Sequence, residues 1–258
     1  MDRLMSWHFD VQQGMYFDKH VKLNGFDMFL SDIIQDSYWN YAIIEHESEM
    51  TQSLCQIEQL FHDVNRQPCM YIECHEDQLK TADHFISNGY TLLSEESFMV
   101  YSGYQGMKNN TVQLNVKRVV DDATTTDFID VFTNAYGGNK TPEQPYGELG
   151  VSYMDALTRS FSDTQKFHHI VCYEEAIPVS IASLCYANGK GGIYNVGTLP
   201  DKRGKGFGTA ATNACIDEWK KLGGDKLFLQ TETGSKVEKW YSNLGFKLVF
   251  IGRIYIKD

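Results

Sequence analysis

The sequence predicts an α/β protein of the α+β kind, in which helices flank a mixed central sheet and two similar domains follow one another in tandem. Two observations predict this fold class. From about residue 112 onward, strand-like and helix-like patterns alternate. In addition, the layout of residues 69–101 returns in residues 226–256: a strand, a polar turn, an amphipathic helix that ends at a glycine before an aromatic residue, and a strand pair.

The repeat places the two domains at residues 1–105 and 112–258, with a boundary near "YQGMKNNT", residues 104–111. Upstream of the first copy, "SYWNYAIIE" and "EMTQSLCQIEQLFHDVN" supply a further strand and a further helix. The alternative is two unrelated α/β pieces that share a helix-glycine-strand ending, because such endings are frequent.

The second domain is predicted to contain its elements in the order β-α-α-β-β-β-α-β-α-β-β. "VQLNVKRV" is typical of a strand, and "TTTDFIDVFTNAYGG" has the capping start, apolar spacing and Gly-Gly stop of a helix. After the short helix "SYMDALTRSF", the turn-like segments "EAIP" and "NGKGG" separate three strands. The helix "GTAATNACIDEWKKL" is predicted to end at Gly223 and Gly224, and a strand, a helix and a strand pair follow it.

The composition and net charge of the chain limit the kinds of partner that it can bind. The 258 residues include 23 basic and 34 acidic side chains, a formal charge of −11. This charge repels a polyanion, so we expect no nucleic-acid partner. The beginning of the chain has no apolar signal segment, and no run of about eighteen apolar residues occurs, so we expect no membrane contact and a cytoplasmic location.

The cysteines and the histidine pair are expected to be structural. The cysteines lie mostly in apolar runs, without CxxC spacing or a histidine-rich neighbour, which indicates reduced core thiols and no metal site. They are Cys55, Cys69, Cys74, Cys172, Cys185 and Cys215. His168 and His169 begin a strand, where successive side chains point to opposite faces, so the pair is not expected to chelate a metal.

A glycine-rich loop, Arg-Gly-Lys-Gly-Phe-Gly-Thr at residues 203–209, stands between a strand and a helix. Glycines let backbone N–H groups approach a phosphate, and the helix N-terminus adds partial positive charge. Lys202, Arg203 and Lys205 add cationic donors. No Walker A string GxxxxGK[ST] is present. A dinucleotide fingerprint over residues 206–211 fits poorly, because residues 200–205 separate it from its strand.

The pattern Arg-x-x-Gly-x-Gly, preceded by a strand ending in Leu-Pro and followed by "KLFLQTE" and "KWYSNLGFKLV", resembles the GCN5-related N-acetyltransferase (GNAT) superfamily over about residues 112–258. The resemblance implies the acyl-CoA N-acyltransferase fold and acetyl-CoA (coenzyme A) as co-substrate, with its pyrophosphate on this loop. It also implies that the pantetheine arm pairs with the strand segment "NVGTL", where Gly197 suits a bulge or a close approach, or else tight strand packing. The implied cofactor-binding residues are Val196, Gly197, Thr198, Leu199, Arg203, Gly204, Lys205, Gly206, Phe207, Gly208 and Thr209.

The resemblance also implies a catalytic tyrosine. Tyr241, in "WYSNLGF", stands where the family commonly carries the general acid that protonates the departing thiolate. A phenol with a pKa of about 10 stays protonated at neutral pH, although Tyr241 also suits a packed aromatic role beside Trp240. The matching position in the first domain is Phe85, and that domain contains no Arg-x-x-Gly-x-Gly. We therefore expect a degenerate domain there, one that shapes or covers the substrate cleft.

The general base is left open among Glu232, Glu174, Glu175 and a water molecule. The expected activity is acetyl-CoA-dependent N-acetyl transfer to the primary amine of a small molecule or peptide. The acidic charge of the protein suits a cationic acceptor. Transfer of a longer acyl group, decided by residues 137–150, and a non-catalytic acyl-CoA sensor are the alternatives. The final strands could also pair across chains in a homodimer.

Overall fold

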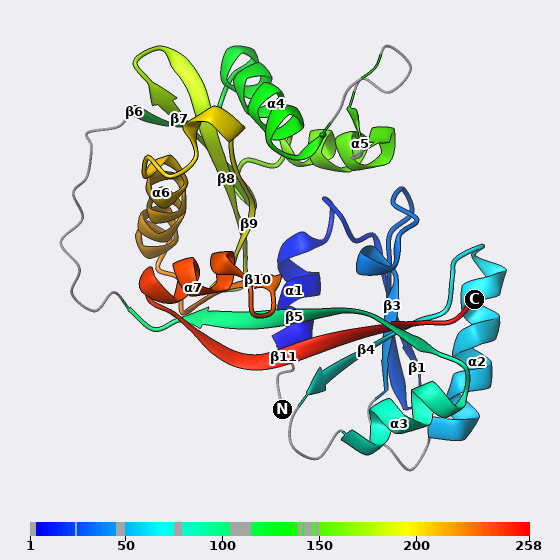
Figure 1. The fold of residues 1–258 in the computed structure, drawn as a ribbon. Coiled ribbons are helices and arrows are strands. Elements are labelled where there is room, and N and C mark those ends of the chain that lie inside the picture. Colours follow the sequence, from blue (N-terminus) through cyan, green and yellow to red (C-terminus); the bar gives the residue numbers. More distant parts are fainter. Residues whose placement is uncertain are drawn as a thin grey trace. The chain divides into compact units, whose positions relative to one another are not determined.

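The computed structural model describes residues 4–23, 25–44, 50–74, 79–103, 115–138, 141, 146–147 and 150–258. The chain divides into two compact units, drawn in Figure 1. Unit 1 comprises Met1–Met15 and Gly103–Leu229, and unit 2 comprises Tyr16–Ser102 and Gln230–Asp258. Each unit therefore takes in a segment from the far end of the chain. The predicted boundary at residues 104–111 lies outside the described residues.

Unit 1 contains a mixed sheet with strand order β10-β9-β8-β7-β6. Neighbouring strands are antiparallel except β9 and β10, which are parallel. The strands are β6 (Asn115–Arg118), β7 (Phe167–Glu174), β8 (Ile177–Ala187), β9 (Lys190–Thr198) and β10 (Lys226–Glu232). The last three residues of β10, from Gln230 onward, belong to unit 2. Because β7 and β8 lie inside the sheet, their side chains are buried almost throughout.

Helices cover both faces of this sheet. They are α1 (Leu4–Gln12), α4 (Asp122–Tyr136), α5 (Gly150–Ser160) and α6 (Phe207–Lys221), with a short 3₁₀ turn, η5 (Pro200–Lys202). His169 of β7 contacts α4 through Phe128 and α5 through Ser160, whereas His168 points to the opposite face and contacts Glu218 of α6. Within the described part of the chain, no helix is both long and apolar enough to cross a membrane.

Local sequence signals explain where these helices begin and end. The side chain of Asp121 accepts a hydrogen bond from the backbone N–H of Thr124 at 2.8 Å and closes a capping box at the start of α4. At the C-terminal end of α6, the N–H of Gly224 donates to the carbonyl of Trp219 at 3.0 Å, and Gly223 has a φ of 69°. The predicted glycine stop is confirmed, because this conformation is easy only for glycine.

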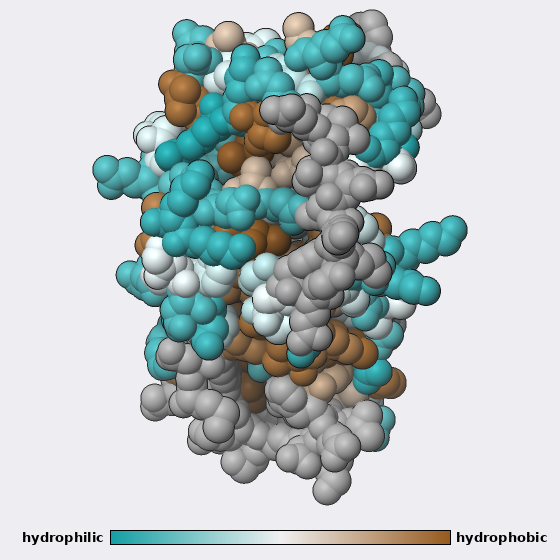
Figure 2. All heavy atoms as spheres, turned by 90° about the vertical axis from the view of Figure 1, so that its left-hand side faces the viewer, coloured by the Kyte–Doolittle hydropathy of each residue, from teal (hydrophilic) through white to brown (hydrophobic). Residues whose placement is uncertain are grey.

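The outward face of α6 is charged. Asp217 and Lys220 form an exposed i,i+3 pair, and Lys221 pairs with Glu218. Figure 2 shows hydrophilic side chains over much of the upper part of the face it draws. The opposite side of α6 buries apolar residues such as Ile216 and Cys215 against the sheet. The helix is therefore amphipathic, as its sequence predicts.

In unit 2 the strand order is β1-β2-β3-β4-β11-β5. Its strands are β1 (Lys19–Leu23), β2 (Phe26–Leu30), β3 (Tyr41–Ile44), β4 (Cys69–Cys74), β5 (Thr91–Tyr101) and β11 (Phe246–Ile256). The 3₁₀ turn η1 (Ser37–Trp39) and the helices α2 (Met50–Asp63), α3 (Leu79–Ser87) and α7 (Lys236–Asn243) complete it. Strand β11, from the end of the chain, lies between β4 and β5 and runs antiparallel to both.

The predicted element order is confirmed as far as α7, but the predicted strand pair at the end of each repeat is wrong. Each pair is one continuous strand of 11 residues, β5 in the first copy and β11 in the second. The backbone of Gly252 stays in register with both β4 and β5. A Cβ at Gly252 would overlap the hydroxyl of Tyr71, so the glycine makes room for a side chain.

Candidate active site

Strands β9 and β10 part soon after they begin. Their parallel ladder covers three residue pairs and ends where Gly192 meets Phe228. From Ile193 to Thr198, β9 is registered only with β8, although the structure describes all of β9 and β10. One backbone edge of β9 is therefore turned away from any strand partner. Such an edge offers N–H and C=O groups to an extended ligand.

A β-bulge lies where the strands have parted. Gly197 is registered with Ile181 and Tyr194 with Ser183, so two β9 residues, Asn195 and Val196, stand opposite a single residue of β8. Asn195 takes a left-handed φ of 53° and its side-chain amide donates to the Ser183 hydroxyl at 3.2 Å. The bulge is thus one to two residues before Gly197.

Gly197 serves tight packing against α4. A Cβ at this position would lie 2.9 Å from Cε2 of Tyr136 and 3.0 Å from Cβ of Ala135. The Tyr136 hydroxyl donates to the carbonyl oxygen of Val196 at 2.6 Å. Burial raises the pKa of Tyr136, which keeps this phenol a proton donor. The end of α4 therefore holds the bulge in place.

The glycine loop leads directly into α6. Gly204 and Gly206 have φ angles of 78° and 90°, and a Cβ on either would meet no atom within 4 Å. Backbone conformation, not space, requires glycine at both positions. Gly206 is the N-cap of α6 and offers no side chain, and the first intrahelical bond runs from the N–H of Ala210 to its carbonyl at 3.0 Å. The N–H groups of the first turn precede that bond, which suits an anion.

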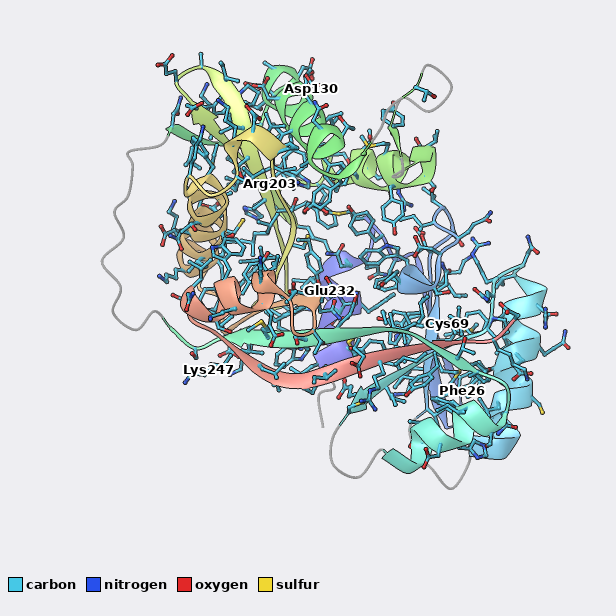
Figure 3. All side chains as sticks on the ribbon, viewed as in Figure 1. Phe26, Cys69, Asp130, Arg203, Glu232 and Lys247 are labelled. Atoms are coloured by element: carbon cyan, nitrogen blue, oxygen red, sulfur yellow. The ribbon has the colours of Figure 1, made fainter. Side chains whose placement is uncertain are left out.

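The three cations of the loop have different surroundings. Lys202 forms an ion pair with Glu174, and this hydrogen bond raises the pKa of Lys202 and lowers that of Glu174. Arg203, labelled in Figure 3, donates from Nε to the carbonyl of Thr198 at 3.2 Å and from Nη2 to that of Ala135 at 3.3 Å. Lys205 is exposed, and no hydrogen bond or ion pair to it is found among the described residues.

Tyr241 and Glu232 belong to unit 2, whereas the glycine loop belongs to unit 1. Tyr241 lies on α7, whose first turn is capped by the Ser235 hydroxyl. Its side chain is buried, with its ring 4.5 Å from that of Trp240 and edge-on to Phe246 at 5.9 Å. Glu232, labelled in Figure 3, is exposed at the end of β10.

The residue that corresponds to Tyr241 in the first repeat is a core residue. Phe85 on α3 is 0% exposed, and its ring packs 5.6 Å from those of Tyr90 and Tyr255. The structural roles expected for the histidine pair are confirmed. The two ring nitrogens of His169 lie 2.8 Å from the hydroxyls of Ser160 and Ser183.

Sequence analysis missed the pair formed by His8 and Tyr194. Helix α1, which was not predicted, brings Nδ1 of His8 to 2.7 Å from the Tyr194 hydroxyl. Burial lowers the pKa of His8 to about 3, so the ring is neutral and shares a hydrogen bond with the phenol. A Cβ at Gly192 would lie 2.9 Å from the Tyr194 hydroxyl. The pair is therefore positioned where β9 and β10 part.

The comparisons with known proteins agree with this geometry. A GCN5-related N-acetyltransferase from Kribbella flavida superposes with a TM-score of 0.71 at 16% identity, covering 98% of this chain and 94% of that one. A GCN5-related N-acetyltransferase from Sphaerobacter thermophilus gives a TM-score of 0.65 at 12% identity, over 90% of this chain and 80% of that one. A tandem GNAT protein from the clavulanic acid biosynthesis pathway gives a TM-score of 0.60 at 9% identity, covering 90% of this chain and 77% of that one.

These likenesses, together with the parted strands and the glycine loop, define the fold as that of the acyl-CoA N-acyltransferases. Residues 135–246 match the Acetyltransferase (GNAT) family. No curated protein matches the sequence. The matched range contains the places where the sequence predicted the site: β9, the glycine loop, Glu232 and Tyr241.

Proposed function

We propose that this protein is an acetyl-CoA-dependent N-acetyltransferase that acetylates a primary amine by direct attack. The observation that carries the proposal is the parting of β9 from β10 beside the glycine-capped N-terminus of α6. A coenzyme A molecule needs both features, because it has an anionic diphosphate and an extended arm that carries amides. The family match over residues 135–246 supports the same activity.

In this proposal the diphosphate binds the first-turn N–H groups of α6, at Phe207, Gly208 and Thr209. Gly204 and Gly206 give the loop the left-handed backbone that keeps those groups accessible. Lys205 is the direct cationic contact, because Lys202 already pairs with Glu174 and Arg203 already donates to two carbonyl oxygens. Arg203 then acts mainly by joining the end of β9 to the end of α4.

The pantetheine arm takes the place of a strand partner along Val196–Leu199. The carbonyl of Val196 already accepts from Tyr136, so we assign the remaining backbone groups of this segment to the arm. Gly197 contributes by letting α4 approach the strand. The acetyl carbonyl then lies toward the bulge, in reach of backbone donors that stabilise negative charge on oxygen.

The chemical step needs no covalent enzyme intermediate. The neutral amine attacks the thioester carbon, a C–N bond forms, and the C–S bond breaks as the tetrahedral intermediate collapses. We propose that Tyr241 gives the thiolate its proton and that Glu232 takes the proton lost by the amine. Glu174 is a weaker candidate for the base because its pairing with Lys202 lowers its pKa.

The acceptor is proposed to be a small-molecule or peptide amine that is cationic in solution, in keeping with the formal charge of −11. The residues of the first repeat are proposed to be a degenerate acetyltransferase-like portion that helps to shape the acceptor site. Cytoplasmic location and a homodimer remain predictions from the sequence. Residues 137–150, which were expected to set the acyl length, lie largely outside the described residues.

Thiol release from acetyl-CoA, followed with a panel of primary amines, tests the proposal. Release that depends on both the amine and the enzyme supports an N-acetyltransferase. Uptake of acetyl-CoA without release for any amine favours the acyl-CoA sensor instead. Faster release from a longer acyl-CoA with the same amine favours the second enzymatic alternative.

A further inference from the structure

A row of buried polar side chains lies within unit 1, on the face of the sheet that α4 and α5 contact. His169 of β7 is registered with Ser183 of β8, and cross-strand partners share a face. Ser160, the last residue of α5, contacts the other nitrogen of the imidazole. The three residues are at most 2% exposed. Water therefore does not compete for the hydrogen bonds between them.

The row reaches the bulge of β9 through Asn195. In a regular strand the side chain of Asn195 would point away from that of Tyr194, the residue registered with Ser183. The left-handed φ of 53° at Asn195 turns its side chain toward Ser183 instead. The amide donates to the Ser183 hydroxyl at 3.2 Å and to the sulfur of Met15 at 3.9 Å. A residue other than glycine keeps such a conformation only where its surroundings hold it.

The neighbours of His169 fix the position of its proton. Burial, followed by electrostatic repulsion from His168 and Arg118, lowers the pKa of His169 to about 3, so the ring is neutral and carries one N–H. The Ser160 hydroxyl has a single proton and donates it to the carbonyl of Leu157 at 2.5 Å. Its oxygen therefore accepts from Nε2 of His169, 2.8 Å away. The other ring nitrogen, Nδ1, is then an acceptor.

The hydroxyl of Ser183 completes the row. It lies 2.8 Å from Nδ1 of His169, and its oxygen already accepts from the Asn195 amide. The proton of Ser183 is therefore donated to Nδ1. Every hydrogen bond then runs in the same direction, from the bulge of β9 through β8 and β7 to the end of α5. The members of such a chain polarise one another, so a change at one of them affects the next.

We propose that His169 is a positioning residue for β9: through Ser183 it holds Asn195 in the left-handed conformation of the bulge. A bulge adds one residue to a strand, so its loss would move the backbone that follows by one position relative to β8. That backbone is the segment Val196–Leu199, which we assign to the pantetheine arm. The effect on acetyl-CoA rests on the proposed function, whereas the effect on the bulge does not.

Carbon chemical shifts of Asn195 report its backbone conformation and test the first step. In full-length protein labelled with ¹³C-asparagine, the signal of Asn195 is the one that Asn195→Gly removes. In Ser183→Ala and in His169→Phe, its Cα and Cβ shifts are expected to move from left-handed toward extended values. His168→Phe is the matched control, because His168 is equally buried but bonds Glu218 on the opposite face, and it is expected to leave the shifts unchanged.

Calorimetry with acetyl-CoA tests the consequence for the cofactor. His169→Phe is expected to weaken binding about three- to tenfold in the wild-type background and less than about twofold in an Asn195→Gly background, because glycine takes a left-handed φ without an anchored side chain. His169→Asn, whose side-chain oxygen replaces Nδ1 as the acceptor for Ser183, is expected to restore most of the affinity. A general loss of stability would not depend on residue 195 in this way.

Thermal melting accompanies each variant, and Ser183→Ala removes a single oxygen atom, so it serves if His169→Phe does not fold. Unchanged Asn195 shifts in the folded variants overturn the inference. Displaced shifts with unchanged acetyl-CoA affinity overturn its consequence for the cofactor. Absence of acetyl-CoA binding by the wild-type protein is the failure of the proposed function, and the shifts, which need no cofactor, still decide whether His169 holds the bulge.

Discussion

The hydroxyl of Tyr136 lies 2.6 Å from the carbonyl oxygen of Val196 and so joins the last residue of α4 to the bulge of β9. The same ring lies against Gly197. The helix therefore fixes the part of β9 that we assign to the pantetheine arm. The contact links helix packing in unit 1 to the strand segment that we propose as a cofactor site.

Tyr136→Phe is expected to weaken acetyl-CoA binding about three- to tenfold. The variant removes one buried hydrogen bond and frees the Val196 carbonyl, at a cost of about 1 kcal/mol in the free energy of unfolding. Calorimetry and urea unfolding measure the two effects. Tyr173→Phe is the control: it removes a hydroxyl on β7 that donates to Asp127 of α4. Unchanged affinity in Tyr136→Phe would separate the bulge from the cofactor site.

Gly197→Ala is expected to destabilise the protein by about 1–3 kcal/mol. The new methyl group lies 2.9 Å from the Tyr136 ring and 3.0 Å from Ala135, so α4 or β9 has to shift. Gly204→Ala is the comparison: its Cβ meets no atom, and only the strained φ of 78° opposes it, at about 1 kcal/mol. Urea unfolding measures both. Equal stability for Gly197→Ala and wild type contradicts the packing role.

Lys205→Ala is expected to weaken coenzyme A binding about three- to thirtyfold and to reduce its dependence on salt. The lysine is exposed beside the N-terminus of α6, where it contributes charge attraction that salt screens. Lys221→Ala removes an equal charge at the far end of the same helix and is the control. Identical salt dependence for the two variants argues against a diphosphate contact at Lys205.

Tyr241→Phe is expected to lower kcat about ten- to a thousandfold and to leave acetyl-CoA affinity unchanged, as loss of a general acid does. The ring packing against Trp240 and Phe246 survives the change, because only the hydroxyl is removed. Steady-state thiol release gives kcat, and unfolding checks stability. Turnover equal to that of wild type removes Tyr241 from the mechanism.

Because two histidines are buried, we expect the free energy of unfolding to decrease in acid. Burial lowers the pKa values of His8 and His169 to about 3, below the ordinary histidine value of 6.5. Between these values the unfolded chain binds protons that the folded chain does not, so the free energy of unfolding falls as pH decreases below about 6.5. Each histidine contributes up to about 1.4 kcal/mol per pH unit.

Glu96 opposes this trend, because its raised pKa of about 7 means that the folded chain binds its proton first as pH decreases. With two histidines against one carboxyl group, the net slope between about pH 4.5 and 6.5 still favours unfolding in acid. Urea unfolding between pH 4.5 and 7.5 measures the slope, and His8→Gln is expected to reduce it. A flat profile would mean that these rings are protonated in the folded state.

Local patterns were sufficient to predict most of the helices and strands from β6 to α7. The glycine loop, the start of α6 and its end at Gly223 depend on backbone conformations that the sequence itself specifies. Helix α1 was missed because its buried residues contact strands far away in the chain, as His8 does at Tyr194. A local pattern carries no information about such a partner.

The two repeats were recognised, but the sequence did not reveal that unit 2 incorporates the last strand of the chain. β11 pairs with β4 and β5 over long registers, and neither pairing leaves a local signal. Glu96 was not singled out for a related reason. Burial raises its pKa to about 7, and no local pattern predicts that burial.

Titration of the full-length protein with acetyl-CoA, followed by calorimetry, tests the central claim most directly. The account predicts one site per chain with a dissociation constant in the range of about 1 μM to 1 mM, weakened by Lys205→Ala and unaffected by Lys221→Ala. Absence of heat with acetyl-CoA and with coenzyme A alike would contradict a cofactor site at the start of α6.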